Sequence, residues 1–285
     1  MRILVTGAGG MLGRDTAAAC RSRGAEVVPL SHGELDITDG PAVDATLAAQ
    51  RPDVVINCAA WTDVDGAEDH EPEASRVNTE APGIVAAAAA DVGATIVHLS
   101  SDYVFDGAKR SPYVESDHTG PLSAYGRSKL AGETSVAVAN PNHVVVRSSW
   151  LFGLAGRNFV ETMVQLASRQ SEVLVVSDQV GCPTYTAHLA DALARLVETD
   201  AHGIRHIAAG GSCSWYEFAQ EIFDQLGLEC RVMAATTDML ARPAPRPAYS
   251  ALTSERPDAI ELPSWRVGLS EYLRERESHR SEVAA

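Results

Sequence analysis

Short apolar runs alternate with helix-compatible stretches through the first two-thirds of the chain. The runs are RILVT (2–6), AEVVPL (25–30), DVVIN (53–57), TIVHLS (95–100), HVVVRS (143–148), EVLVVSD (172–178) and GIRHIAA (203–209). Strands that recur with helices between them build βαβ units and a parallel sheet that is covered on both faces. The sequence therefore predicts an α/β fold with a doubly wound parallel sheet.

A glycine-rich loop, GAGGMLG (7–13), follows the first of these runs. Glycines in this place permit a tight turn and let the backbone approach a pyrophosphate, which the free N–H groups of the next helix can bind. A glycine motif alone is weak evidence, but this one follows a strand and opens a helix. We therefore predict a Rossmann-type dinucleotide site. Its first contacts are expected to be Gly7, Gly10, Met11, Leu12 and Gly13.

The end of the second expected strand bears on the choice of cofactor. NAD sites of this type carry an acidic residue there, which holds the ribose 2′-OH. Here Ser31 and His32 follow the strand and Glu34 comes late, so we expect no carboxylate at the tip to repel a 2′-phosphate. The sequence favours NADPH, with His32 as a further contact. NADH stays open, because no arginine lies at that tip.

The second half of the chain is less regular than the first. After about residue 150 the alternation weakens, and ARPAPRPAYSAL (241–252) contains too much proline for a helix or a central strand. A chain of 285 residues is long enough for a large domain with a smaller partner. We predict an NADP-binding Rossmann domain over residues 1–150, with about 172–178 and 187–210 added. The remainder of 151–285 is expected to form mainly a substrate-binding lobe.

Composition argues against several classes of function. A net charge of −15 without long acidic runs disfavours binding to nucleic acid or to an anionic membrane. The sequence shows no run of about 18 apolar residues and no signal-peptide pattern. Its five scattered cysteines form no C-x-x-C motif, and no histidine cluster has metal-ligand spacing. We expect a reduced, cytoplasmic protein without a metal.

A tyrosine and a lysine stand four positions apart in SAYGRSKLAGE (123–133). On a helix, Tyr125 and Lys129 would lie on one face. A neighbouring ammonium group lowers the pKa of a phenol from its usual value of about 10. Tyr125 could then donate a proton near neutral pH. By its spacing alone the pair fits an ordinary exposed helix better, so a catalytic interpretation depends on the rest of the chain.

Together with the glycine loop, this Y-x-x-x-K motif resembles the short-chain dehydrogenase/reductase superfamily. Narrower motifs extend the resemblance over about residues 1–275. They are NCAAWTDVDGAE (57–68), SSDYVFDG (100–107), DQVGCPT (178–184) and RPAYSAL (246–252). With these motifs the chain resembles the dTDP-4-dehydrorhamnose reductase family.

The resemblance implies a hydride transfer from a nicotinamide to the C4 carbonyl of a sugar. In that scheme Tyr125 donates the proton, Ser101 hydrogen-bonds the same oxygen, and Lys129 lowers the pKa of Tyr125 and binds the nicotinamide ribose. Such groups stabilise charge where it develops in the transition state. The resemblance also assigns further cofactor contacts, namely Asp36 and Ile37 at the adenine and Ala59 and Ala60 at the end of the third strand.

The implied substrate is a dTDP-4-keto-6-deoxysugar, first of all dTDP-4-dehydro-L-rhamnose. The matching substrate residues are Thr62, Val64 and Asp65 in the loop after the third strand, with Trp150 beside the sugar. Arg246 matches an arginine suited to phosphate, because a guanidinium group can bind two phosphate oxygens at once.

The chain departs from the family at Ser101, where threonine is more usual, and at two metal positions, and other readings stay open. Some members bind a metal through two glutamates, where this chain has Asp15 and Ala187, so we predict no metal and a monomer or homodimer. A reductase of another dTDP-4-ketodeoxysugar, an epimerase, or a non-catalytic regulatory subunit of the same fold would share many of the motifs. A dehydratase fits less well, because Asp102 is followed by Tyr103 and not by a glutamate.

Overall fold

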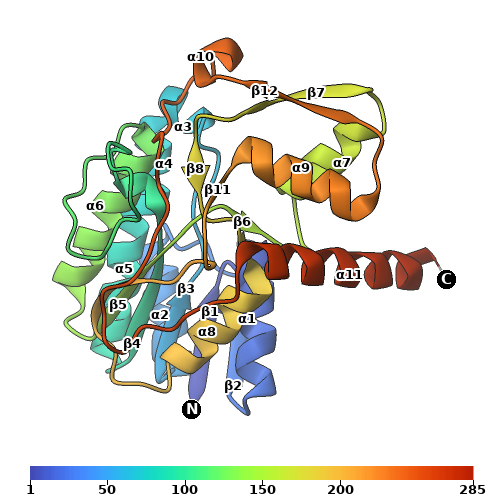
Figure 1. Ribbon diagram of the computed structural model, residues 1–285. Helices are drawn as coiled ribbons and strands as arrows, with labels where there is room; N and C mark the ends of the chain where they lie inside the picture. The colour runs from blue at the N-terminus through green and yellow to red at the C-terminus, as the bar shows by residue number, and fades with distance from the viewer. Residues whose placement is uncertain (285) are drawn as a thin grey trace.

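The computed structural model describes residues 1–284, and its centre is a six-stranded parallel sheet (Figure 1). Its strands are β1 (Arg2–Thr6), β2 (Glu26–Leu30), β3 (Val54–Asn57), β4 (Thr95–Ser101), β5 (His143–Ser148) and β10 (Gly203–His206). They lie in the order β10-β5-β4-β3-β1-β2, and every pairing is parallel. The strand order reverses at β1, so β2 and β3 lie on either side of it. The predicted α/β, Rossmann-type fold is confirmed.

Helices cover both faces of this sheet. One face carries α1 (Met11–Ser22) and α8 (Thr186–Leu196), and the other carries α2 (Gly40–Gln50), α5 (Ala81–Asp91) and α6 (Ala124–Ala139). Alternate side chains of β1 belong to the hydrophobic cores on the two opposite faces of the sheet. Ile3 and Val5 pack with Leu189 of α8, whereas Leu4 packs with Val85 of α5. Because both faces are buried, the strands are continuous apolar runs.

A smaller lobe lies beyond the carboxyl ends of the strands (Figure 1). It contains α7 (Phe159–Ala167), α9 (Trp215–Leu226), the short α10 (Thr237–Leu240) and a separate sheet of β7 (Glu172–Val176) and β12 (Arg231–Ala235). The first turns of α11 (Trp265–Ala284) complete its core through Trp265, Leu269 and Tyr272. The lobe therefore has a hydrophobic core of its own.

One predicted strand belongs to this lobe and not to the main sheet. We expected residues 172–178 to extend the Rossmann domain, and that placement was wrong, because β7 pairs only with β12. Val173 and Val175 are buried in the lobe core, while Leu174 between them is 57% exposed. This alternation is typical of a strand with one solvated face, whereas a central parallel strand is buried on both faces. The predicted division at residue 150 otherwise stays a prediction.

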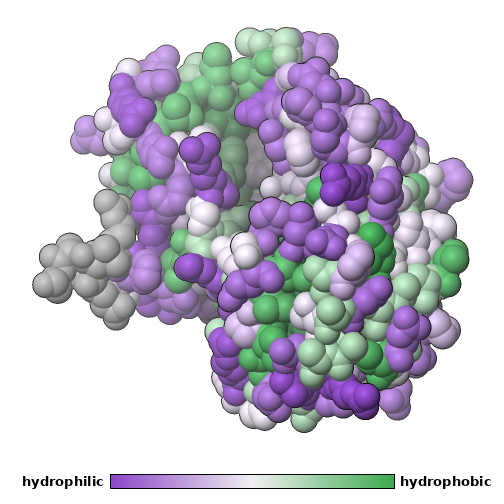
Figure 2. All heavy atoms as spheres, turned by 180° about the vertical axis from the view of Figure 1, so that it is seen from behind, coloured by the Kyte–Doolittle hydropathy of each residue, from purple (hydrophilic) through white to green (hydrophobic). Residues whose placement is uncertain are grey.

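The remaining elements are short. They are α3 (Gly66–Asp69), α4 (Glu71–Ser75), the π-helix η1 (Arg76–Glu80), the 3₁₀ helix η2 (Asp102–Val104), β6 (Leu151–Phe152), β8 (Val180–Gly181), β9 (Thr184–Tyr185) and β11 (Cys213–Ser214). The strand β6 pairs with β9, and β8 pairs with β11. The space-filling view from behind shows a recess in the upper part of the molecule, with hydrophobic atoms in its depth (Figure 2). Within residues 1–284, no helix combines the length and apolarity that a membrane span requires.

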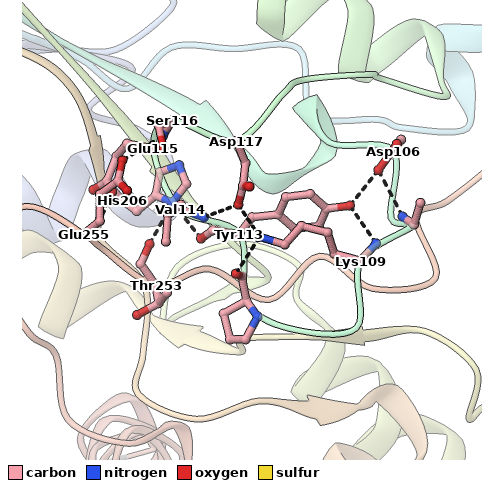
Figure 3. A network of polar contacts seen from close by, with 12 residues as sticks. Asp106, Lys109, Tyr113, Val114, Glu115, Ser116, Asp117, His206, Thr253 and Glu255 are labelled. Atoms are coloured by element: carbon pink, nitrogen blue, oxygen red, sulfur yellow. Dashed lines mark hydrogen bonds and ion pairs between the residues drawn. The ribbon is translucent and has the colours of Figure 1, made fainter.

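An extended segment after α10, residues 246–255, crosses from the lobe back to the main sheet, and we call it the strap. Its backbone pairs with Tyr113, which donates to the Ala251 carbonyl (2.8 Å) and accepts from Thr253 (2.9 Å). Figure 3 shows the end of the strap, where the Glu115 carboxylate accepts from the backbone N–H groups of His206 (2.9 Å) and Glu255 (3.0 Å). These contacts fix the strap against β10.

Candidate active site

The glycine loop, which we call the cradle, packs so closely against neighbouring backbone that side chains at Gly7 and Gly13 would clash with it. Gly7 has a φ of +66°, and a Cβ at this position would lie 2.6 Å from the backbone nitrogen of Ala59. A Cβ on Gly13 would lie 2.3 Å from the carbonyl oxygen of Gly7. The loop can therefore pack against both β3 and α1 only with glycine at these two positions.

The start of α1 offers free N–H groups to an anion. Its N-cap is Gly10, which has no side chain to cap the helix, and its first turn contains no acidic residue. The first N–H groups of a helix have no partner within the helix, and the helix dipole favours a negative charge there. This geometry fits the pyrophosphate of a dinucleotide.

Buried hydrogen bonds hold the end of β3 beside this cradle. The Thr6 hydroxyl donates to Oδ1 of Asn57 (2.7 Å), and the backbone N–H of Ala59 donates to the same oxygen (3.2 Å). The Asn57 amide also pairs with Nδ1 of His98 on β4 (3.2 Å). Asn57 thus fixes the chain where Ala59 and Ala60 turn toward the loop.

A cavity of about 570 Å³ extends along this edge of the sheet. Its wall includes all twelve residues that we predicted to bind the cofactor. These residues are Gly7, Gly10, Met11, Leu12, Gly13, His32, Asp36, Ile37, Ala59, Ala60, Tyr125 and Lys129. Thr62, predicted for the substrate, also lies in this wall. We did not predict Arg157, which lines the same cavity from the loop before α7. Its guanidinium group adds a positive charge to the cavity wall from outside the predicted cofactor domain (residues 1–150), and no sequence motif indicated it.

The far end of the cavity contains charges of both signs. Oδ1 of Asp36 accepts from the backbone N–H (2.9 Å) and the hydroxyl (2.8 Å) of Thr38, and these bonds lower the pKa of Asp36. Nη2 of Arg76 donates to the same hydroxyl (3.1 Å).

The expectation of no carboxylate at the tip of β2 was wrong. Glu34 turns back, and its Oε2 accepts from the backbone N–H (2.8 Å) and hydroxyl (2.6 Å) of Ser31.

The helix α6 carries Tyr125 and Lys129 to the near end of the cavity. Ser123 caps the helix by accepting from the backbone N–H of Gly126 (3.1 Å). Asn78 of η1 donates to the Ser128 hydroxyl (3.1 Å), and π-helical turns are often found at functional sites. A Cβ on Gly132 would lie 2.0 Å from the carbonyl oxygen of Asn78, so α6 packs closely against η1.

Burial shifts the pKa values of both Tyr125 and Lys129 in the free protein. Burial raises the pKa of Tyr125 to about 12, although a hydrogen bond with Ser101 opposes the shift. The ammonium group of Lys129 donates to the Leu99 carbonyl oxygen (2.6 Å). Burial lowers the pKa of Lys129 to about 8, and Glu133 opposes that shift. In the free protein the desolvation of Tyr125 dominates, so its pKa lies above the usual value, and the lowering by Lys129 stays a prediction.

Ser101 is buried at the end of β4, beside Tyr125. Its hydroxyl oxygen accepts from the backbone N–H of Tyr103 (3.1 Å), and its hydroxyl group donates to Oδ1 of Asp102 (3.1 Å). The three predicted catalytic residues are thus brought together by β4 and α6. Their roles in a reaction stay predictions.

A second cavity, of about 510 Å³, lies between the strap and the small lobe. One wall is apolar and includes Phe159, Leu166 and Trp215, and the other includes Tyr103 and Arg246. The ring of Tyr103 meets the ring of Tyr125 edge to face, with centroids 5.6 Å apart. Because Tyr125 lines the first cavity and Tyr103 the second, the two cavities adjoin at this pair.

Two residues predicted to bind substrate are paired with each other. The guanidinium of Arg246 donates to both carboxylate oxygens of Asp65, at 2.9 Å each. Arg242 donates to the same carboxylate (3.1 Å). Although burial opposes the shift, these bonds lower the pKa of Asp65 to about 2. The ion pair links the loop after β3 to the strap. Val64, next to Asp65, lines neither cavity.

Trp150 lies between the two parts of the molecule and stacks on Trp215. Their ring centroids are 3.5 Å apart and their planes differ by 3°. Trp150 has a φ of +49°, an uncommon backbone conformation for a bulky residue. A Cβ on Gly181 would lie 2.3 Å from the Trp150 indole, so the ring fits only against glycine. Trp150 therefore supports Trp215, which we did not predict, and is not itself part of either cavity wall.

Asp15, which the resemblance places at a metal-binding position, has a hydroxyl partner in this structure. Its carboxylate accepts from the Thr186 hydroxyl, and burial raises its pKa. Ala187 packs against the core of the small lobe. Among the side chains that the structure describes, those of residues 1–279, no three histidine, cysteine or acidic groups are placed to hold a metal ion.

Known proteins share this sequence and fold almost from end to end. Residues 1–278 match the model of the family described as the RmlD substrate binding domain. The dTDP-4-dehydrorhamnose reductase of Streptomyces griseus is 46% identical over 280 residues, which cover 95% of this chain and 92% of that protein. A protein of Streptomyces antibioticus, described as a probable dTDP-4,6-dihydroxy-2-methyloxan-3-one 4-ketoreductase, is 44% identical and covers 95% of this chain and 94% of its own length.

A solved structure with a bound cofactor has the same fold. The dTDP-4-dehydrorhamnose reductase of Bacillus anthracis, determined in complex with NADP, aligns with a TM-score of 0.93 and 36% identity. The match covers 96% of this chain and 99% of that one.

Proposed function

We propose that this chain, which belongs to the RmlD substrate binding domain family, reduces the 4-keto group of a dTDP-4-dehydro-6-deoxysugar. The family and its relatives make it an oxidoreductase of the dTDP-4-dehydrorhamnose reductase type. Within that type we assign it dTDP-4-dehydro-L-rhamnose as substrate and NADPH as hydride donor.

The observation that carries the proposal is the meeting of two cavities at Tyr125. One cavity starts at the glycine cradle and ends at Tyr125 and Lys129, and the other adjoins it across Tyr103. A dinucleotide in the first and a nucleotide sugar in the second would present the nicotinamide and the sugar ketone to each other beside Tyr125. Holding two reactants in this way supplies a large part of the rate enhancement of many enzymes.

The polar groups at this junction suit the reduction of a ketone. A bound nicotinamide supplies the hydride, and the protein must supply a proton and stabilise the developing alkoxide. Tyr125 keeps its proton over the physiological range, because its pKa lies well above neutrality, and it can give that proton to an alkoxide. Ser101 can hydrogen-bond the same oxygen. Lys129 is held over the cavity by Leu99, in place to bind the nicotinamide ribose.

Charges at the adenosine end support the use of NADPH without excluding NADH. His32 lines the cavity, and Arg76 reaches Thr38 in the cavity wall, so two basic side chains can approach a 2′-phosphate. Glu34 and Asp36 bring carboxylates to the same end. We therefore expect oxidation of NADPH and slower oxidation of NADH.

The second cavity suits a nucleoside diphosphate. Its aromatic wall, with Phe159 and Trp215, can pack against a flat base, and Arg246 can bind phosphate oxygens. In the free protein the guanidinium of Arg246 is already occupied by Asp65. A diphosphate would take over or share those hydrogen bonds.

Replacement of Arg246 tests this assignment. We expect Arg246→Ala to raise the KM for the nucleotide sugar by about 10- to 100-fold, because hydrogen bonds to charged groups contribute about 1.5–3 kcal/mol. The value of kcat should change much less, since a residue that binds the diphosphate equally in the ground state and the transition state affects mainly KM. Steady-state kinetics of the variant provide the measurement. The matched control is Arg266→Ala, because Arg266 lines neither cavity and its side chain is 62% exposed against 13% for Arg246. Equal effects of the two substitutions would contradict the assignment.

The identity of the sugar has one specific alternative. The Streptomyces antibioticus relative, at 44% identity, is described as a 4-ketoreductase of a different dTDP-linked sugar. The family resemblance therefore fits a reductase of another ketodeoxysugar as well. A non-catalytic binding subunit is a further reading, which predicts tight binding without turnover.

The test is oxidation of the cofactor by the purified protein, followed at 340 nm, with dTDP-4-dehydro-L-rhamnose generated in situ. We expect NADPH oxidation and dTDP-L-rhamnose as the product identified by NMR. Turnover only of another dTDP-4-ketosugar would move the assignment to that sugar. No turnover of any of these ketosugars with either cofactor would overturn the proposal.

A further inference from the structure

A buried carboxyl group lies directly behind Ser101. Asp102, the first residue of η2, is 1% exposed. Its Oδ1 accepts from the Ser101 hydroxyl (3.1 Å), its Oδ2 accepts from the Ser250 hydroxyl (2.5 Å), and Ser149 provides a further hydroxyl. Among the described side chains, those of residues 1–279, no cation forms an ion pair with it. A buried carboxylate without a cationic partner is expensive to keep ionised.

Burial accordingly raises the pKa of Asp102 to about 6, although its hydrogen bonds oppose the shift. The titratable groups that face it are Tyr103, Tyr125 and Cys182. Burial raises the pKa of all three, so they stay neutral between pH 5 and 8. Asp102 is therefore the group in this cluster that changes its charge in that range.

The charge of Asp102 decides what the Ser101 hydroxyl can do. The ionised carboxylate takes the hydroxyl hydrogen of Ser101, which can then only accept hydrogen bonds, as it does from the Tyr103 N–H. A neutral carboxyl group can donate to Ser101 instead and release that hydrogen for another acceptor. An ionised Asp102 would also disfavour the loss of a proton from Tyr125, because like charges repel.

We propose that Asp102 is a positioning residue whose neutral form turns the Ser101 hydroxyl toward the ketone oxygen. The inference rests on the proposed function, since it assigns Ser101 a substrate oxygen. Bound cofactor and substrate would exclude water further from the cluster and thereby favour the neutral form.

This position also gives the strap a role in the site. Ser250, which bonds Asp102, belongs to RPAYSAL, and its backbone N–H donates to the Val180 carbonyl oxygen in DQVGCPT (2.7 Å). Asp102 itself belongs to DYVFDG. The three narrowest motifs of the sequence therefore meet around one buried carboxyl group, although they are far apart along the chain.

The test compares Asp102→Asn with the unaltered protein by kcat/KM for the ketosugar between pH 5 and 8.5. Asparagine cannot ionise and keeps a donor for Ser101. We expect the ratio of kcat/KM, variant over unaltered protein, to rise at least tenfold between pH 5 and pH 8. Any loss from Lys129 at high pH affects both proteins and cancels. The control is Asp106→Asn, an exposed carboxylate of the same motif that is bonded to Tyr113, and its ratio should stay constant.

A constant or falling ratio for Asp102→Asn would overturn the inference, because a purely structural role lowers activity equally at every pH. If that variant fails to fold, Ser250→Ala is the substitute. It removes a hydrogen bond that lowers the pKa of Asp102 and should move the limb of kcat/KM near pH 6 to higher pH. An unmoved limb would equally contradict us. Absence of turnover in the unaltered protein would instead reject the proposed function.

Thermal stability offers a readout that needs no substrate. The pKa of Asp102 in the folded protein is raised above its ordinary value of 3.8. Its stabilising contribution is thus present below about pH 4 and is lost as the pH rises through 6. We expect the Tm of the unaltered protein, relative to Asp102→Asn, to fall between pH 4.5 and 7.5. A difference in Tm that is independent of pH would contradict the assigned protonation.

Discussion

Replacing Tyr125 by phenylalanine should lower kcat for the ketosugar by about 10²- to 10⁴-fold, the usual contribution of a positioned proton donor. The phenol is the protein group that can give a proton to the alkoxide at the junction of the two cavities. Phenylalanine keeps the ring and its packing against Tyr103. We therefore expect the cofactor to bind the variant nearly as tightly as the unaltered protein.

Two measurements make this prediction specific to the proton. Stopped-flow single turnovers with excess enzyme report the chemical step, and fluorescence titration reports cofactor binding. The matched control is Tyr216→Phe, since that tyrosine lies on the small lobe and bonds only to Gln220 in the hydrogen bonds described. Near-normal turnover by Tyr125→Phe would remove Tyr125 from the role of proton donor. Loss of cofactor binding with an unchanged chemical step would assign it to cofactor binding instead.

Replacement of Arg147 by methionine should lower the free energy of unfolding by about 3–5 kcal/mol, because a buried carboxylate would lose its partner. Arg147 on β5 binds both oxygens of Glu133 on α6, at 2.8 and 2.7 Å. Only 2% of the Arg147 side chain and 6% of the Glu133 side chain are exposed. Ser100 bonds the same carboxylate. This pair holds α6, and with it Tyr125, against the sheet.

Urea denaturation followed by circular dichroism measures the loss. The double variant Arg147→Met with Glu133→Gln should recover most of the stability, because the buried charge is then removed from both sides. Loss of the exposed pair between Arg23 and Glu198 provides a control and should have little effect. If Arg147→Met and the double variant are equally unstable, packing and not the unpaired charge explains the loss.

The main sheet and the cofactor cavity could be predicted from the sequence, because both depend on local patterns. Buried parallel strands are continuous apolar runs, and all six strands of the main sheet had been predicted from such runs. The glycine cradle depends on close backbone contacts that only glycine permits, so its spacing is visible in the sequence. Tyr125 and Lys129 lie one turn apart on a single helix, and their neighbourhood follows from their spacing.

The features that were missed depend on side chains brought together from distant parts of the chain. The placement of β7 was wrong because its pairing partner, β12, lies about 60 residues later in the chain and could not be identified from the local pattern. Asp65 and Arg246 pair across the molecule, and Trp215 reaches Trp150 from the small lobe. The pKa of Tyr125 depends on burial, which the i, i+4 spacing does not reveal. Spacing along the chain predicts neighbours on one element, but it does not predict desolvation or contacts between elements.

The most direct test of the account is the transfer of deuterium from the cofactor to the sugar. NADPH deuterated at the nicotinamide C4, on either face in turn, is given to the purified protein with dTDP-4-dehydro-L-rhamnose, and the product is examined by NMR. We predict dTDP-L-rhamnose with deuterium at C4 from one of the two labelled cofactors. A reduced sugar without deuterium at C4 from either cofactor, or no reduced sugar at all, would contradict the central claim.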